Sequence, residues 1–122
     1  MGAKILIVDD SVTVRMYHKQ ILESEGYECD EAENGMEALE KAQKNKYDLF
    51  LVDINMPVLD GYSFVKRLRE GEGCVAPVIM ISTESEMKDM DLAYESGASM
   101  YLTKPVHSTT LLINVKLLTH RA

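Results

Sequence analysis

The chain of 122 residues has no tryptophan, only two cysteines and no long hydrophobic run. Because a membrane-spanning helix needs about 20 predominantly apolar residues, the missing run excludes one. The start, Met1-Gly2-Ala3-Lys4, leads into a predicted strand and not into a signal peptide. Cys29 and Cys74 have no metal-ligand spacing and no nearby histidine partner, so we interpret each as a small, partly buried hydrophobic residue. These absences predict a protein of the reducing cytoplasm.

Basic residues are also scarce, since 13 lysines and arginines accompany 20 aspartates and glutamates, for a formal net charge of −7. A protein that binds nucleic acid regardless of sequence needs a basic surface, and this charge argues against one. No Gly-x-x-x-x-Gly-Lys-Ser/Thr segment occurs, so the chain has no nucleotide-binding P-loop. We expect a single domain over residues 1–122 that is monomeric, with neither nucleic acid nor membrane among its partners.

The most informative stretch is residues 47–61. It contains an apolar run, Leu49 to Val52, that is too short for a helix and is followed by turn residues, which is typical of a buried strand. The run ends at a carboxylate, Asp53, before a turn that contains Pro57. Taken alone, Asp53 is most simply a polar strand end or the residue that starts this turn. An acid at the carboxyl end of a buried strand also lies where open α/β sheets place their chemistry.

The same alternation of strand and helix runs along the whole chain. Besides the strand at residues 49–52, strands are predicted at residues 4–8, 27–32, 78–81 and 99–103. Helices are predicted between residues 11 and 26, over residues 36–45, 61–70 and 86–96, and from residue 108 onward. Asp10 or Ser11 is expected to cap the first helix, Gly97 the fourth and Ser108 the last. This order predicts an α/β fold, a doubly wound five-stranded parallel sheet with five helices on its two faces.

Polar residues end four of these strands. The first is followed by Asp9 and Asp10, the third by Asp53, the fourth by Ser82 and the fifth by Lys104. In a parallel sheet the carboxyl ends lie along one edge, so these side chains can meet. Each has a simpler interpretation alone: a helix cap for an aspartate or serine, a strand end for a serine, a surface position for a lysine. Their coincidence at one edge favours a shared site.

Together these groups match the needs of phosphoryl transfer. Clustered carboxylates suit a hard divalent cation, and Mg²⁺ prefers one or two of them together with waters and a phosphate oxygen. Lys104 supplies a compact positive charge, and Ser82 supplies a hydroxyl donor for an anionic oxygen. Asp53 is then the candidate nucleophile. The residues therefore predict a metal-assisted phosphoryl transfer to Asp53.

The whole chain resembles the receiver domain of bacterial two-component response regulators. The resemblance rests on six matching segments: Ile7 to Ser11, Val52 to Pro57, Asp60-Gly61, Pro77 to Ser82, Gly97-Ala98 and Tyr101 to Pro105. It implies a flavodoxin-like sheet with the strand order 2-1-3-4-5. It also implies that Asp53 is the phosphoacceptor, and that Mg²⁺ is held by Asp9, Asp10, Asp53 and the backbone carbonyl of Asn55.

The same resemblance implies a conformational switch. Ser82 is the hydroxyl that turns toward the phosphoryl group, and Lys104 is the ion-pair partner of that group. Tyr101 is the aromatic residue whose rotamer reports the switch. A cis peptide bond is expected before Pro105, where proline permits it.

Within this family the chain is most similar to stand-alone chemotaxis regulators of the CheY type. The similarity rests on the Asp-Asp-Ser-x-Thr-x-Arg opening from Asp9 to Arg15, on the missing output domain, and on Asn55 with Glu84, whose positions tune acyl-phosphate lifetime in the family. Thr83 departs from the pattern, since the family usually has alanine there. The implied function is a phosphoacceptor switch rather than an enzyme. It takes a phosphoryl group from a histidine kinase and binds a target in chemotaxis or flagellar motor control, with a phosphatase as a further candidate partner.

The fourth helix carries methionine and tyrosine residues that cannot all face inward: Met87, Met90 and Tyr94, beside Ala93. Some are therefore expected to be exposed beside Tyr101, and a soft surface of this kind suits a protein partner. We expect the downstream target to bind the face formed by the fourth helix, the fifth strand and the fifth helix.

The three histidines receive no role in this interpretation. His18, His107 and His120 lie on predicted helices away from the sheet edge, and we interpret them as surface residues.

Three alternatives remain at this point. A flavodoxin-like FMN carrier needs a phosphate cradle after the first strand, where this chain has Asp9-Asp10. A phosphatase with an aspartate nucleophile resembles Asp-x-Asp-x-Thr/Val, which this chain does not match. A phosphorelay intermediate, or the isolated receiver of a larger regulator, would keep the same chemistry and change only the role.

Overall fold

The computed structural model describes residues 2–83 and 87–119. Within these residues five strands alternate with five helices along the chain, as predicted. The bounds are β1 Lys4–Val8, α1 Val12–Glu23, β2 Glu28–Ala32, α2 Gly35–Lys44, β3 Leu49–Asp53, α3 Gly61–Glu70, β4 Val78–Ser82, α4 Met87–Ser96, β5 Met100–Thr103 and α5 Ser108–Thr119.

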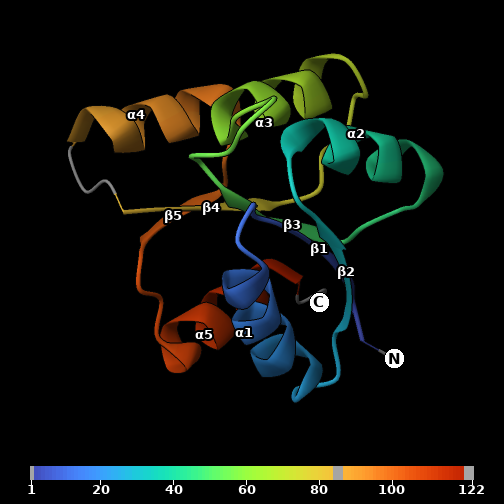
Figure 1. The fold of residues 1–122 in the computed structure, drawn as a ribbon, viewed down its shortest axis with the longest axis vertical. Helices are drawn as coiled ribbons and strands as arrows, with labels where there is room; N and C mark the ends of the chain where they lie inside the picture. Colours follow the sequence, from blue (N-terminus) through green and yellow to red (C-terminus); the bar gives the residue numbers. More distant parts are fainter. Residues whose placement is uncertain (1, 84–86, 120–122) are drawn as a thin grey trace.

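The strands form one parallel sheet in the order β2-β1-β3-β4-β5, which confirms the predicted topology. Figure 1 shows three layers, with α1 and α5 on one face of the sheet and α2, α3 and α4 on the other. Since every strand runs in the same direction, all five carboxyl ends lie along one edge. That edge carries the loops that hold the predicted site.

Two hydrophobic clusters hold the layers together, one on each face of the sheet. Alternate strand residues point to opposite faces, so Phe50 and Val52 join one cluster while Leu49 and Leu51 join the other. All four of these side chains are buried, which is why β3 appears in the sequence as a continuous apolar run. Burial of each such side chain contributes about 1.5–3 kcal/mol to the free energy of unfolding. The sheet centre is therefore a firm support for its carboxyl edge.

Local sequence explains most helix ends. Ser11 is the N-cap of α1, where its Oγ accepts a hydrogen bond from the backbone N–H of Val14 at 3.3 Å. Gly97, just after α4, has a φ of +117°, the backbone region in which glycine is favoured. The predicted cap at Ser108 is wrong by one position. Ser108 is the first residue of α5, and the carbonyl of His107 accepts from the N–H of Leu111 at 3.0 Å.

One predicted surface residue is buried. His18 exposes only 3% of its area and belongs with Arg15 and Leu22 to the inner face of α1, so its interpretation as a surface residue was wrong. The spacing of three and then four residues is the periodicity of a helix face that packs inward. His107 is exposed, as predicted, but lies in the loop before α5. His120 lies outside the described residues.

The apolar residues of the fourth helix, α4, are partly buried and partly exposed, as predicted. Ala93 is fully buried and Met90 is partly buried against the core, whereas Leu92 and Tyr94 expose 48% and 43% of their areas. The side chain of Met87 lies outside the described part.

Cys29 is buried and Cys74 is partly buried, which confirms their interpretation as small hydrophobic residues. Among the described helices, none is both long and apolar enough to cross a membrane.

Candidate functional site

The first part of the site is the loop between β1 and α1. Asp9 follows the last residue of β1 and is only 3% exposed, whereas its neighbour Asp10 is exposed. The Oδ1 atom of Asp9 accepts a hydrogen bond from the backbone N–H of Ser11 at 2.9 Å. Its Oδ2 atom lies 3.3 Å from Nζ of Lys104. The Asp9 carboxylate is thus held from two sides and faces the sheet edge.

The second part is Asp53, the last residue of β3. Its register partner on the neighbouring strand β4 is Ile81, and only 5% of the Asp53 residue is exposed. Burial raises the pKa of Asp53 to about 6, and the nearby Asp9 carboxylate adds to the rise, while Lys104 opposes it. Near neutral pH Asp53 is therefore mostly ionised and partly desolvated, which suits a nucleophile.

Lys104 joins the two carboxylates. Its Nζ lies 3.2 Å from Oδ1 of Asp53 and 3.3 Å from Oδ2 of Asp9. Burial opposes the charged form, but the two carboxylates outweigh it and raise the pKa of Lys104. The backbone N–H of Lys104 donates to the carbonyl of Ser82 at 2.7 Å, and the peptide bond before Pro105 is cis, as predicted. Lys104 is therefore a fixed positive charge between two acids.

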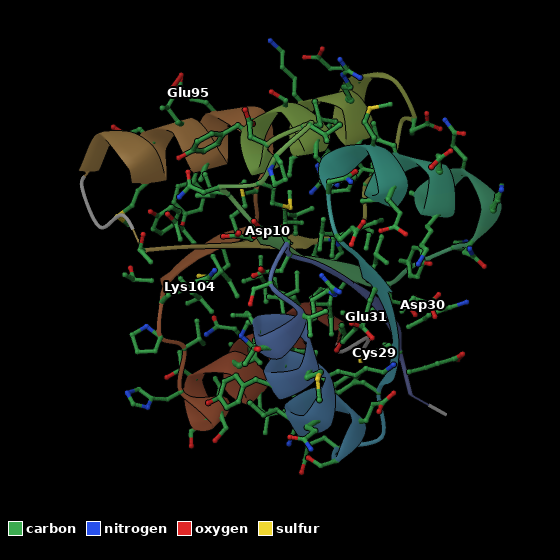
Figure 2. The ribbon with its side chains drawn as sticks, viewed as in Figure 1. Asp10, Cys29, Asp30, Glu31, Glu95 and Lys104 are labelled. Atoms are coloured by element: carbon green, nitrogen blue, oxygen red, sulfur yellow. The ribbon has the colours of Figure 1, made fainter. Side chains whose placement is uncertain are left out.

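The three aspartates fit a hard divalent cation. Asp9, Asp10 and Asp53 each offer a carboxylate oxygen, and these oxygens lie within 4.8 Å of one another. Figure 2 shows Asp10 on the loop after β1 and Lys104 on the loop after β5. All three donors are carboxylate oxygens, and the exposure of Asp10 leaves one side open to water, which is the ligand set that Mg²⁺ prefers. Asn55 is an exposed residue two positions after Asp53, and its carbonyl stays a predicted ligand.

The predicted switch residues lie on β4 and β5. Ser82 is fully buried at the end of β4, opposite Thr103 of β5. Tyr101 is 6% exposed and packs in the cluster on the α2–α3–α4 face. Their roles in a switch stay predictions, and so does that of Glu84, which lies outside the described residues. The sheet thus brings Asp9, Asp53, Ser82 and Lys104 to one edge, and it places Tyr101 two residues inside that edge.

Sequence reasoning missed two buried residues beside the site. His18 lines an apolar pocket of about 320 Å³ together with Thr83 and Lys104. Burial lowers the pKa of His18, partly offset by Asp9, and Lys104 lowers it further, so the imidazole is neutral at pH 7. Arg15 is only 8% exposed and also packs under the β1–α1 loop. The spacing of Arg15, His18 and Leu22 is that of a buried helix face, but arginine and histidine are not the residue types expected there.

Comparison with known proteins identifies the same family by sequence and by structure. Residues 5–116 match the model of the response regulator receiver domain. The transcriptional regulatory protein ResD of Bacillus subtilis is 38% identical over 119 residues, which cover 98% of this chain and 49% of ResD. SrrA of Staphylococcus aureus, also a transcriptional regulatory protein, is 38% identical over 121 residues and is likewise covered to 49%. The chain thus spans about half the length of the curated relatives it matches.

Solved structures resemble the fold over nearly its whole length. The chemotaxis protein CheY4 of Vibrio cholerae has a TM-score of 0.91 and 37% identity, with 97% of this chain and 99% of CheY4 covered. A putative response regulator from Chloroflexus aurantiacus has a TM-score of 0.93 and 33% identity, with 99% and 100% covered. Both similarities cover at least 97% of this chain.

Proposed function

We propose, from the premise that this chain belongs to the response regulator receiver domain family, that it is a two-component phosphoacceptor whose Asp53 takes a phosphoryl group from a histidine kinase. The observation that carries this proposal is the position of Lys104, whose Nζ lies 3.2–3.3 Å from the carboxylates of both Asp53 and Asp9. A buried acid, a second buried acid and a shared cation at one sheet edge supply a nucleophile and a charge for the incoming phosphoryl group.

The transfer is a displacement at phosphorus. A carboxylate oxygen of Asp53 donates an electron pair to the phosphorus, and a new phosphorus–oxygen bond forms. The bond from phosphorus to the imidazole nitrogen of the donor histidine breaks, and its electron pair stays on that nitrogen. Asp53 is positioned for this step because β3 is buried on both faces and fixes the strand end. Lys104, whose Nζ lies 3.2 Å from Oδ1 of Asp53, would offset the negative charge on the oxygens of the transferred group.

A Mg²⁺ ion fits the same acids. Asp9, Asp10 and Asp53 would hold it, with the backbone carbonyl of Asn55 as a further ligand. When bound, the ion supplies positive charge for the oxygens of the phosphoryl group. The residues of the chain keep the ligands in place: β1 and β3 are neighbours in the sheet, so Asp9 and Asp53 are adjacent strand ends.

The phosphorylated form differs from the free form by a group of roughly −2 charge at Asp53. We propose that the Ser82 hydroxyl and Lys104 contact this group, and that Tyr101 changes its side-chain position in response. A contact made in only one conformation shifts the balance between two conformations. Tyr101 is 6% exposed and belongs to the same hydrophobic cluster as Ala93 of α4. Asn55 and Glu84 are proposed to tune the lifetime of the acyl phosphate.

The proposed target face consists of α4, β5 and α5. Leu92, Tyr94, Ile113 and Leu117 are large apolar residues on these helices that are at least 43% exposed. The similarity to the chemotaxis protein CheY4, which is covered to 99%, supports a chemotaxis role. We propose that this role is in flagellar motor control in the cytoplasm. The alternative is the receiver of a larger regulator or a phosphorelay intermediate. It is supported by ResD and SrrA, of which this chain covers only 49%.

Intact mass after incubation with acetyl phosphate tests the proposal. The protein is incubated with Mg²⁺, with EDTA, and as the Asp53→Ala variant with Mg²⁺. We expect one phosphoryl adduct that needs both the metal and Asp53. An adduct that persists in Asp53→Ala would show that the nucleophile is a different residue. The decay of the adduct separates the two roles, because a rapid signal predicts a short lifetime and a relay predicts a long one.

A further inference from the structure

Arg15 is a buried charged residue that the proposed chemistry does not use. It ends the Asp9–Arg15 segment on which the similarity to CheY-type regulators partly rests, yet it lies on α1 and points toward the sheet. Only 8% of the residue is exposed. A buried guanidinium needs partners for its N–H donors, and their identity indicates what it does.

The first partner is the backbone of Asp9. Nη1 of Arg15 donates a hydrogen bond to the carbonyl oxygen of Asp9 at 2.6 Å. That oxygen belongs to the peptide group that joins Asp9 to Asp10, and a peptide group is planar. A fixed Asp9 carbonyl therefore also fixes the N and Cα atoms of Asp10, which lie in the same peptide plane. The bond acts on the link between two of the three acids of the site.

The second partner is on β2. Nε of Arg15 donates to Oε1 of Glu31 at 2.9 Å, and Lys19 binds the other oxygen, Oε2, at 3.3 Å. Figure 2 shows Glu31 on β2 beside α1. The hydrogen bond from Arg15 is the main reason that the pKa of Glu31 is lowered, so this carboxylate stays ionised as a counter-ion. Glu31 thus holds the guanidinium in one orientation.

The Asp9 residue is consequently held at each polar group. Its N–H donates to the carbonyl of Ala32 at 3.0 Å, and its Oδ1 accepts from the N–H of Ser11 at 2.9 Å. Its carbonyl accepts from Arg15, and its Oδ2 lies 3.3 Å from Lys104. Of these contacts, the arginine bond alone acts on the peptide that leads to Asp10. The Ser11 bond closes a turn around Asp10, and the arginine bond holds the Asp9–Asp10 peptide itself.

We propose that Arg15 is a positioning residue for the metal site: it fixes the Asp9–Asp10 peptide so that both carboxylates face Asp53. This inference rests on the proposed function, because it assigns Arg15 a part in binding Mg²⁺. The proposed role of Arg15 is to orient the ligands. Its orienting effect strengthens Mg²⁺ binding, whereas its positive charge close to the three aspartates weakens Mg²⁺ binding by Coulomb repulsion.

The test is Mg²⁺ binding to the purified protein, measured by isothermal titration calorimetry with the metal alone. We expect Arg15→Gln to weaken Mg²⁺ binding by about 10-fold, as loss of a group that orients metal ligands does. Arg15→Lys keeps the positive charge and N–H donors but loses the planar guanidinium that bonds to both Asp9 and Glu31, so we expect its affinity to lie between those of Arg15→Gln and the unaltered protein. Lys19→Gln is the matched control. It removes the other cation on Glu31 without touching Asp9, and we expect its Mg²⁺ affinity to be unchanged or slightly higher.

A second measurement separates positioning from general damage. In labelling by acetyl phosphate, Arg15→Lys should raise the half-saturating Mg²⁺ concentration and leave the maximal rate nearly unchanged. Unchanged or tighter Mg²⁺ binding in Arg15→Gln would overturn the inference, because charge removal alone predicts that result. Equal weakening in Lys19→Gln would also overturn it. If the unaltered protein bound no Mg²⁺, the proposed metal site itself would be wrong, and the inference with it.

Discussion

Gly61 and Asp53 are in such close contact that no side chain fits between them. A β-carbon at position 61 would lie 2.6 Å from the backbone carbonyl oxygen of Asp53 and 2.8 Å from the α-carbon of Ile54. The N–H of Gly61 also donates to the carbonyl of Ile54 at 2.9 Å. The first turn of α3 therefore rests directly on the end of the strand that carries the proposed phosphoacceptor.

This contact predicts that Gly61→Ala lowers the free energy of unfolding by roughly 1–3 kcal/mol, because backbone atoms have to move to admit the methyl group. It should also slow labelling of Asp53 by acetyl phosphate. Urea unfolding monitored by circular dichroism measures the first effect and intact mass the second. Lys66→Ala, at an exposed position of the same helix, is the control and should change neither. Normal stability of Gly61→Ala would mean that the loop relaxes freely.

The raised pKa of Asp53 predicts that the metal-free protein loses stability as the pH rises. The unfolded chain releases this proton near pH 3.8 and the folded protein near pH 6. Between these values the folded state binds more protons, so the free energy of unfolding falls with increasing pH. Asp53→Asn removes the titration and should be more stable than the unaltered protein in EDTA at pH 7, by roughly 1–3 kcal/mol.

Urea unfolding in EDTA at pH 4.5, 5.5 and 7 tests this sign. The stability difference between Asp53→Asn and the unaltered protein should grow across the series. Addition of Mg²⁺ at pH 7 should reduce the difference, because a cation that binds the folded state stabilises it through the ionised aspartates. A difference that stays constant with pH would contradict a raised pKa at Asp53.

The position of Lys104 predicts two opposite effects of Lys104→Met. In EDTA the variant should be destabilised by roughly 1–3 kcal/mol, because two buried carboxylates lose their cation. In calorimetry it should bind Mg²⁺ more tightly, because the lysine no longer competes for those carboxylates. Lys116→Met is the control, since Lys116 is 59% exposed and pairs only with Glu25, at 3.1 Å, in the described part of the chain. Weaker Mg²⁺ binding in Lys104→Met would contradict this account.

Val58 is predicted to carry backbone strain in the loop after Asp53. Its φ is +70°, and it is the one non-glycine residue with a positive φ among residues 2–83 and 87–119. The N–H of Leu59 donates to the carbonyl of Pro57 at 2.7 Å across it, which closes a tight turn. Asparagine tolerates this conformation better than a β-branched residue, so Val58→Asn should raise the free energy of unfolding by about 1 kcal/mol. Val75→Asn, at a valine that is 91% exposed, makes the same exchange without a positive φ. Equal effects of the two substitutions in urea unfolding would exclude strain as the cause.

The order of strands and helices could be predicted from the sequence because the buried strands are apolar runs between turn residues. The run Leu49 to Val52 is covered on both faces by the two hydrophobic clusters, so all four residues are apolar and the strand is recognisable as a short continuous apolar run. The site followed from the same pattern, since polar residues at the ends of parallel strands share an edge. Of the predicted acids, Asp9 and Asp53 are buried and Asp10 is exposed, a distinction that residue types alone do not make.

Buried polar residues were the part that sequence reasoning missed. Arg15 and His18 occupy core positions of α1 although their residue types are typical of surfaces. Arg15 is buried because Glu31, sixteen positions away, and the carbonyl of Asp9 accept its hydrogen bonds. Such a pairing depends on the register between β1 and β2, which a single sequence does not contain.

Chemical localisation of the phosphoryl group tests the central claim most directly. The protein is labelled with acetyl phosphate and Mg²⁺, the acyl phosphate is reduced with borohydride, and the resulting homoserine is mapped by peptide mass spectrometry. The account predicts homoserine at position 53, with Asp9 and Asp10 unchanged and no conversion in EDTA. Homoserine at position 9 or 10, or conversion at position 53 that is equally efficient without metal, would contradict it.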